Sequence, residues 1–217
     1  MESSYIGKAF VFTSTEVMTI LSGLGVKKFF GFCEEKLPDR QGKIAALDSL
    51  FRRGVIRNSE KGFVLNEPFH EFFSIIAQPY KTFSVDNPYG EKTLIYAGDK
   101  IVTMKRHSLS PDKLCISCSD ITEAEQMLKA EYQLPKDEEP ELALMLPENM
   151  EGKDELFGDN NITAVYFKLS DESSEPLLCV LRYGLCCMIA DLSENKVSTE
   201  LYTEETFDKL FEKIVLQ

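Results

Sequence analysis

Two segments of the chain repeat the same pattern 83 residues apart, and this repeat constrains the fold more than any other feature of the sequence. The first segment, LSPDKLCISCSDITEAEQML, begins at Leu109, and the second, LSENKVSTELYTEETFDKL, begins at Leu192. The offset falls from 83 residues at Leu109/Leu192 to 81 at Thr122/Thr203, which predicts a shorter strand-to-helix join in the second copy. The alternative explanation is chance similarity between two meanders with Ser and Asp turns. A true duplication requires both copies to form the same elements.

Short β-rich runs precede a helical pattern in each copy, and turn residues separate the runs. In the first copy the runs are KTFSV, KTLIYA, IVTMKRHS and LCISCS, and the helix ITEAEQMLKAEY carries a capping box at Thr122 and Glu125. In the second they are ITAVYFKLS, PLLCVLRY, LCCMIAD and KVSTEL, before a C-terminal helix. Each copy is therefore predicted as β-β-β-β-α. Joining two copies edge to edge around a pseudo-twofold axis would protect the sheet edges from aggregation.

The predicted fold class is mixed α/β, of the α+β type, with a helical N-terminal segment and two similar antiparallel units in a quasi-twofold body. Residues 1–135 hold the N-terminal helices and the first unit. Residues 136–217 hold an acidic connector (136–161) and the second unit. We expect a short helix in the connector, around ELALML or KDELF, and we expect the two parts to form one continuous body.

Three helices are predicted before the first repeat. The first, near Thr13–Leu24, begins with a capping box formed by Thr13 and Glu16. The second, near Gly42–Arg53, has apolar residues at helical spacing, which predicts a buried stripe: Ile44, Leu47, Leu50 and Phe51. A hairpin follows, with Phe63 packing inward. The third helix, EPFHEFFSIIAQP, has its own inward-facing set: Phe69, Phe72, Phe73 and Ile76.

Charge is distributed unevenly along the chain, although the net charge is −12. Residues 1–108 carry 15 Lys or Arg and 12 Asp or Glu, whereas residues 109–217 carry 9 and 24. The total weighs against a nucleic-acid partner, but the more basic first half keeps that possibility open. The start, MESSYIGKAFVF, lacks the features of a signal peptide, and no apolar run approaches the roughly 20 residues of a membrane span. We therefore expect a soluble cytoplasmic protein.

No catalytic or metal-binding constellation is evident, so we predict a protein that is not an enzyme and has no metal or cofactor. The two histidines, His70 and His107, have no partner at ligand spacing. Cys115 and Cys118 form a C-x-x-C pair within a strand-like run, where alternation points them to opposite faces. We expect reduced thiols at all six cysteines, which also include Cys33, Cys179, Cys186 and Cys187.

Two kinds of binding protein fit these observations. In KIAALDSLFRRGVIRNSEKGFVLN, from Lys43 to Asn66, a helix that ends in Arg-Arg-Gly precedes a hairpin, which is typical of a winged helix. In a DNA-binding regulator, the residues that contact phosphates would be Arg52, Arg53, Arg57 and Lys61. The other possibility is a module that holds a helical partner.

The order of elements resembles the EspG-type chaperones of bacterial type VII (ESX) secretion. FVFTSTEVMTILSGLGV resembles the family's opening, a strand followed by a helix that ends near Gly, and LDSLFRRGVI…GFVLNEPFHEFFSIIAQPYKTFSV resembles the run that leads into its first strand. The resemblance implies a cytoplasmic chaperone or adaptor that binds paired helical hairpins before export, and it transfers no binding residue. The chain is shorter than the usual member, and its second half lacks an evident extra helical bundle. The winged-helix regulator is the alternative function.

Overall fold

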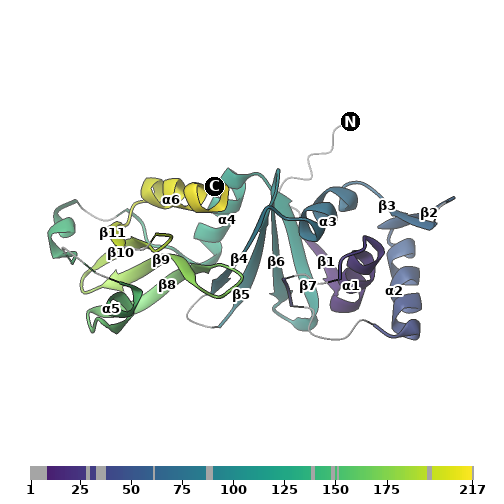
Figure 1. The fold of residues 1–217 in the computed structure, drawn as a ribbon, viewed down its shortest axis with the longest axis horizontal. Coiled ribbons are helices and arrows are strands. Elements are labelled where there is room, and N and C mark those ends of the chain that lie inside the picture. The colour runs from purple at the N-terminus through teal and green to yellow at the C-terminus, as the bar shows by residue number, and fades with distance from the viewer. Residues whose placement is uncertain are drawn as a thin grey trace. The chain divides into compact units, whose positions relative to one another are not determined.

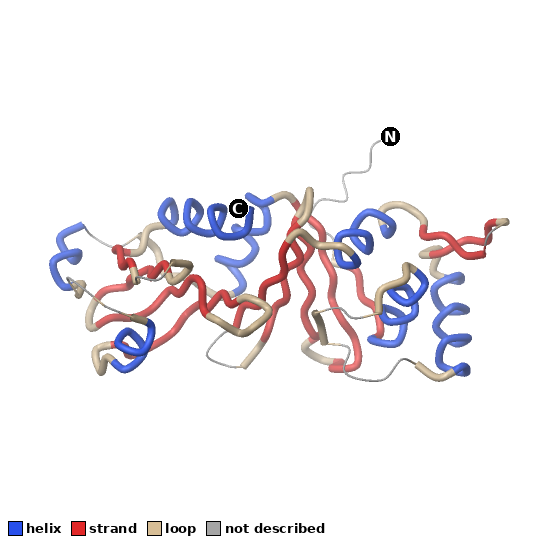
Figure 2. The backbone as a smooth tube through the Cα atoms, in the orientation of Figure 1, coloured by secondary structure: helices blue, strands red, loops and turns tan. Residues whose placement is uncertain are grey.

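The computed structural model describes residues 9–27, 30–32, 38–60, 62–86, 90–137, 140–147, 150, 152–194 and 197–216. The predicted α+β class is confirmed: the described residues form six α-helices, a nine-stranded antiparallel sheet and a separate two-stranded hairpin (Figures 1 and 2). Within these residues, no helix is long and apolar enough to cross a membrane.

The helices and strands have the following bounds. The helices are α1 (Ser14–Gly23), α2 (Arg40–Arg52), α3 (Phe69–Ala77), α4 (Ile121–Glu131), the 3-10 helix η1 (Pro140–Met145), α5 (Lys153–Gly158) and α6 (Glu204–Leu216). The strands are β1 (Phe10–Thr13), β2 (Ile56–Ser59), β3 (Gly62–Leu65), β4 (Lys81–Asp86), β5 (Lys92–Ala97), β6 (Ile101–His107), β7 (Ser110–Ser119), β8 (Ile162–Ser170), β9 (Pro176–Tyr183), β10 (Cys186–Asp191) and β11 (Ser198–Leu201).

The order of strands in the sheet follows the repeat. It runs β1-β7-β6-β5-β4-β8-β9-β10-β11, so each copy extends as a meander away from the β4–β8 pair. Those two strands are antiparallel, with Ser84 opposite Ser170. A helix follows each meander, α4 after β7 and α6 after β11. The predicted β-β-β-β-α order and the edge-to-edge join are therefore confirmed.

The predicted change of offset between the copies is wrong, and so is the second capping box. The N-cap of α4 is Asp120, whose Oδ1 accepts a hydrogen bond from the backbone N–H of Glu123 at 2.9 Å. At the start of α6, Thr203 Oγ1 accepts from the N–H of Thr206 at 3.0 Å. The two capping residues are thus 83 positions apart. Because Asp is at least as good an N-cap as Thr, the helix starts before Thr122, which lies in its first turn.

The repeat also extends further toward the N-terminus than the sequence pattern indicates. α3 precedes β4 and α5 precedes β8, and the fully buried Phe73 and Leu156, 83 positions apart, occupy corresponding places in these helices. The acidic connector contains both expected helical segments, η1 and α5. Among the described residues, the second copy has no counterpart of α1, α2 and the β2–β3 hairpin. Together with β1, which also has no counterpart strand beyond β11, these elements distinguish the first half of the described chain.

The chain divides into two compact units, and the first comprises Met1–Thr82 with Leu94–Ser119. Its core lies between one face of β1, β5, β6 and β7 and the helices α1 and α3. Phenylalanine dominates this core: Phe72 and Phe73 have ring centroids 4.8 Å apart, and Phe12 lies 5.4 Å from Phe73. The predicted inward face of α3 is confirmed, because Phe72, Phe73 and Ile76 are buried and Phe69 packs against them.

The second unit comprises Phe83–Thr93 with Asp120–Gln217. Helices cover both faces of its strands. On one face, Phe207 of α6 contacts Phe167 of β8 with ring centroids 5.2 Å apart. On the other face, Leu156 of α5 packs against Cys179, Leu181 and Met188. Alternate residues of β9 and β10 therefore serve two separate cores, which explains the nearly continuous apolar runs in these strands.

The expected buried stripe of α2 is only partly right. Leu50 is fully buried and Leu47 packs against the core, but the side chains of Ile44 and Phe51 are 58% and 49% exposed. Phe63, expected to pack inward, is 54% exposed. The physical reason is that α2 contacts α1 through the face that carries Ala46 and Ser49, and at about 100° per residue Ile44 and Phe51 lie on nearly the opposite side of the helix. This leaves apolar side chains of α2 and the hairpin in solvent.

Candidate functional site

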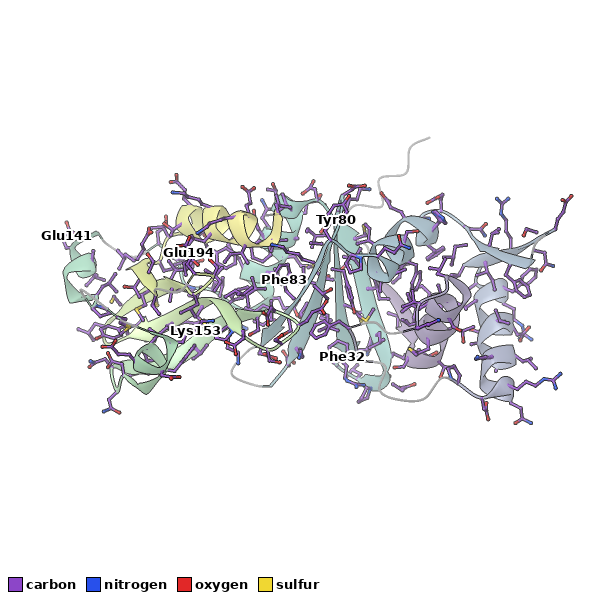
Figure 3. All side chains as sticks on the ribbon, in the orientation of Figure 1. Phe32, Tyr80, Phe83, Glu141, Lys153 and Glu194 are labelled. Carbon is purple, nitrogen blue, oxygen red and sulfur yellow. The ribbon has the colours of Figure 1, made fainter. Side chains whose placement is uncertain are left out.

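An apolar groove in the first unit is the strongest candidate for a functional site. It has a volume of about 570 Å³ and lies between the C-terminal half of α1, one face of α2 and the β2–β3 hairpin. Its lining residues are Thr19, Ile20, Ser22, Gly23, Leu24, Lys43, Leu47, Leu50, Ile56, Phe63, Val64, Leu65 and His70. Figure 3 shows the side chains that project from α2 and the hairpin at this end of the unit.

The hairpin is held firmly at its root. Gly54, with φ of +68°, ends α2 in a conformation that residues with a side chain rarely adopt, and the N–H of Val55 donates to the carbonyl of Leu50 at 2.9 Å. Asn66, just after β3, donates through Nδ2 to the carbonyl of Gly54 at 2.9 Å. The base of the hairpin is thus fixed to the end of α2, and it forms a stable wall of the groove.

The lining of the groove is mostly apolar, and its polar members are Thr19, Ser22, Lys43 and His70. Ile20, Leu50 and Ile56 are buried and form the floor. Leu24, Phe63 and Val64 are exposed and form the rim. Apolar surface of this extent in contact with water is costly, and contiguous patches of this kind mark interaction sites in soluble proteins.

The apolar surface continues from the groove onto the outer side of α2. Lys43, Leu47 and Leu50 are spaced i, i+4, i+7 and line the groove. Ile44 and Phe51 lie on the neighbouring strip of the same helix, at i and i+7. The exposed apolar side chains of α2 therefore widen the groove into a larger contact surface.

Basic side chains outnumber acidic ones around this surface. Among the described residues of α2 and the hairpin, the exposed or half-exposed charged groups are Arg40, Lys43, Arg52 and Arg57 against Asp48 and Glu60. A partner that is apolar on one side and acidic at its flanks would complement this arrangement.

The connection between α1 and α2 depends on one buried carboxylate. Glu16, in the confirmed capping box of α1, accepts a hydrogen bond from the backbone N–H of Thr13 at 2.8 Å. It also accepts from Ser49 Oγ at 2.7 Å and from Arg53 Nη1, which lies 3.0 Å from each of its oxygens. The Arg53 guanidinium covers the Phe12 ring at 4.9 Å and donates to the carbonyl of Val11. This network fixes α2 beside α1, so it sets the shape of the groove.

Of the four residues proposed for DNA contacts, three lie in the described part of the chain, and two of these have acidic partners. Arg53 is engaged by Glu16. Arg52 pairs with Asp48 at 2.7 Å, and Arg57 is exposed on β2, opposite Val64. Lys61 lies outside the described residues. The outward side of α2 mixes apolar with polar and basic side chains. Its exposed residues are Arg40, Gln41, Ile44, Ala45, Asp48, Phe51 and Arg52.

The histidines and cysteines do not gather into a site. His70 lines the groove, and its Nδ1 lies 3.7 Å from a carboxylate oxygen of Glu67. His107 Nδ1 accepts from the N–H of Leu109 at 3.2 Å. Within the described residues, no group of three or more His, Cys, Asp or Glu side chains could hold a metal ion.

The five cysteines within the described residues are free thiols. Cys118 packs on the core face of β7 with Leu114 and Ile116, whereas Cys115 lies on the alternate face, as predicted for the C-x-x-C pair. Cys33 lies outside the described residues.

The sequence matches no model of a known protein family, and no curated protein is significantly similar to it.

Proposed function

We propose that this protein is a non-enzymatic binding protein whose groove between α1, α2 and the β2–β3 hairpin holds a helical segment of a partner. The observation that carries the proposal is the apolar groove itself, bordered by exposed Phe63 and Val64 and extended by exposed Ile44 and Phe51. Covering these side chains would remove a costly apolar surface from water.

An amphipathic helix fits this surface better than other ligands. Helix-in-groove recognition uses apolar anchors at i, i+3, i+4 and i+7 on the bound helix, laid against an apolar cleft. The floor here is aliphatic and the rim carries Leu24, Phe63 and Val64, which suit the apolar face of a helix. The basic side chains of α2 and the hairpin favour a helix whose flanks are acidic.

Within this binding class, we propose a chaperone or adaptor for helical substrates of type VII secretion, acting in the bacterial cytoplasm. The support comes from the order of elements described above: an N-terminal strand and helix, a helix and hairpin, and a duplicated meander with its helices. The substrates of such systems are paired helical hairpins, which present the apolar helical faces that the groove would cover.

A peptide experiment tests helix binding without assuming the biological partner. A fluorescent amphipathic helix of about 20 residues, with a Leu-rich face and Glu at its flanks, is titrated with the protein. We expect saturable binding, weaker binding of the same helix with Lys flanks, and a loss of about tenfold or more for Phe63→Ser. Leu109→Ser, at an exposed turn outside the groove, is the matched control and should not change the affinity. Equal affinity of both variants for the peptide would reject the groove.

A co-expression experiment tests the chaperone role separately. The protein is produced with a panel of paired helical-hairpin secretion substrates, and complexes are isolated by size-exclusion chromatography. We expect a stoichiometric complex that is weakened by Phe63→Ser. If the acidic helix binds but no substrate pair does, the binding class stands and the secretion role is rejected.

DNA binding is the competing outcome. A salt-sensitive shift of duplex DNA that disappears in an Arg52→Glu, Arg57→Glu variant would favour the regulator. This pair of substitutions leaves Arg53 in place, and so avoids disrupting the Glu16 network.

A further inference from the structure

Helices α4 and α6 of the second unit are corresponding helices of the two repeats, and they pack against one another. The offset of 83 residues relates Ala124 to Phe207 and Leu128 to Phe211, and all four are fully buried. The same offset relates Glu125 to Asp208, and Lys129 to Glu212. The charged side chains of this helix pair are therefore corresponding residues in a duplicated structure.

Lys129 of α4 and Asp208 of α6 form an ion pair. Lys129 Nζ donates to both carboxylate oxygens of Asp208, at 2.7 and 3.0 Å, and it lies 3.6 Å from an oxygen of Glu204. The Lys129 side chain is only 14% exposed, whereas its partners Asp208 and Glu204 are 37% and 59% exposed.

The corresponding pair is Glu125 and Glu212, two acidic residues. Glu125 is 3% exposed, and its Oε1 has no hydrogen-bond partner. Burial raises its pKa to about 7, the negative charges of Asp208 and Glu212 on α6 and of Asp120 on α4 add to the increase, and Lys129 opposes it. The first copy has a cation, Lys129, at the position where the second copy has Glu212. Glu125 therefore lacks a cation at the place where the corresponding Asp208 has Lys129.

We propose that the α4–α6 contact is a pH-sensitive latch, closed when Glu125 carries a proton and loosened when it is ionised. In the protonated form, Glu125 is neutral, and its burial beside Asp208 and Glu212 brings no charge repulsion. In the ionised form, it is a desolvated anion facing Asp208 and Glu212, and the repulsion acts directly across the helix pair. This device is independent of the groove in the first unit.

The direction of the pH effect follows from proton linkage. Because the pKa of Glu125 is higher in the folded protein than in the unfolded chain, the folded state binds more protons between about pH 4.5 and pH 7. The contribution of Glu125 to stability is therefore lost as the pH rises through this window. A buried carboxylate in an ion pair usually behaves in the opposite way. Its pKa is lower in the folded protein, so its contribution to stability is lost as the pH falls.

The titration of Glu125 can be measured directly in the full-length protein. The carboxyl carbons of glutamate are labelled with ¹³C, the Glu125 resonance is assigned by its absence in Glu125→Gln, and its chemical shift is followed from pH 4 to pH 9. We expect a midpoint above pH 6 in the wild type and a lower midpoint in Glu212→Gln, where one repelling charge is removed. A midpoint below pH 5 in the wild type would overturn the proposal.

The opening of the helix pair is measured by amide hydrogen exchange of α4 and α6. After correction for the intrinsic effect of pH on exchange, we expect the opening equilibrium of the wild type to increase about tenfold between pH 6 and pH 8.5. Glu125→Gln should show no such increase, whereas the control Glu205→Gln, an exposed position on α6, should behave like the wild type. The same increase in Glu125→Gln as in the wild type would also overturn the proposal.

Discussion

The guanidinium of Arg53 lies 3.0 Å from both carboxylate oxygens of Glu16, and this contact joins the end of α2 to the beginning of α1. The Glu16 side chain is 4% exposed and also accepts a hydrogen bond from Ser49. The carboxylate of this contact is therefore buried inside the unit. An arginine that the sequence offers as a DNA contact is therefore part of the framework that shapes the groove.

Replacing Arg53 by Met should destabilise the protein strongly. The substitution leaves the buried Glu16 carboxylate with its bonds from Thr13 and Ser49 alone, and because Arg53 is itself half-exposed the loss should be about 1–3 kcal/mol. Urea denaturation followed by circular dichroism measures the loss. Arg52→Met removes only the exposed pair with Asp48 and should cost less than about 0.5 kcal/mol. Equal midpoints for the two variants would show that the Glu16 contact adds little.

Gly98, between β5 and β6, should not tolerate alanine. A Cβ atom at this position would lie 3.0 Å and 3.1 Å from the two γ-carbons of Ile75 on α3, which is closer than side chains normally approach. We expect Gly98→Ala to lose about 1–3 kcal/mol, because the helix or the side chain must shift. Combining it with Ile75→Ala removes both crowding γ-carbons, and the double variant should lose less than the sum of the single changes. Additive losses would contradict this steric explanation.

The N-cap residues Asp120 and Thr203, which correspond in the repeat, should stabilise the folded protein by similar amounts. Asp120→Ala and Thr203→Ala each remove a side-chain acceptor from the third residue of a helix, so each should lose about 1 kcal/mol. Thr122→Ala is the control: in the sequence-based prediction it would be the costly change, whereas in the structure Thr122 makes no capping bond. Thermal unfolding of the three variants decides between these assignments, and a larger loss for Thr122→Ala than for Asp120→Ala would reject the observed cap.

The architecture was predictable because a repeat carries long-range information. The shared pattern at Leu109 and Leu192 predicts both meanders and their helices, and it implies the order in which their strands join. The correspondence of α3 and α5 was not evident, since Phe73 and Leu156 are alike only in being buried and their surrounding residues differ. In a packed core, the position of a buried side chain is retained more strictly than its residue type.

The candidate groove could not be predicted, because periodicity identifies an apolar face but does not say what covers it. Ile44 and Phe51 have the spacing of buried residues, yet within the described chain they are exposed. One feature of the sequence does indicate the groove: the apolar stripe on α2 is wider than the contact with α1 alone requires. Glu125 was also misread, because a Thr two residues after Asp120 resembled a helix cap.

The thiols of Cys179, which is buried, and Cys118, which is half-buried, should be nearly inert in the folded protein. Burial raises the pKa of Cys179 to about 12 and that of Cys118 to about 11, and nearby lysines only partly offset the effect. At pH 8 the thiolate fraction is then on the order of 10⁻⁴ for Cys179 and 10⁻³ for Cys118, and only the thiolate reacts readily. After brief treatment of the native protein with iodoacetamide, mass spectrometry of tryptic peptides should find both residues unmodified, and denaturation in urea should make both fully reactive. Rapid native modification of Cys179 would contradict its burial under α5.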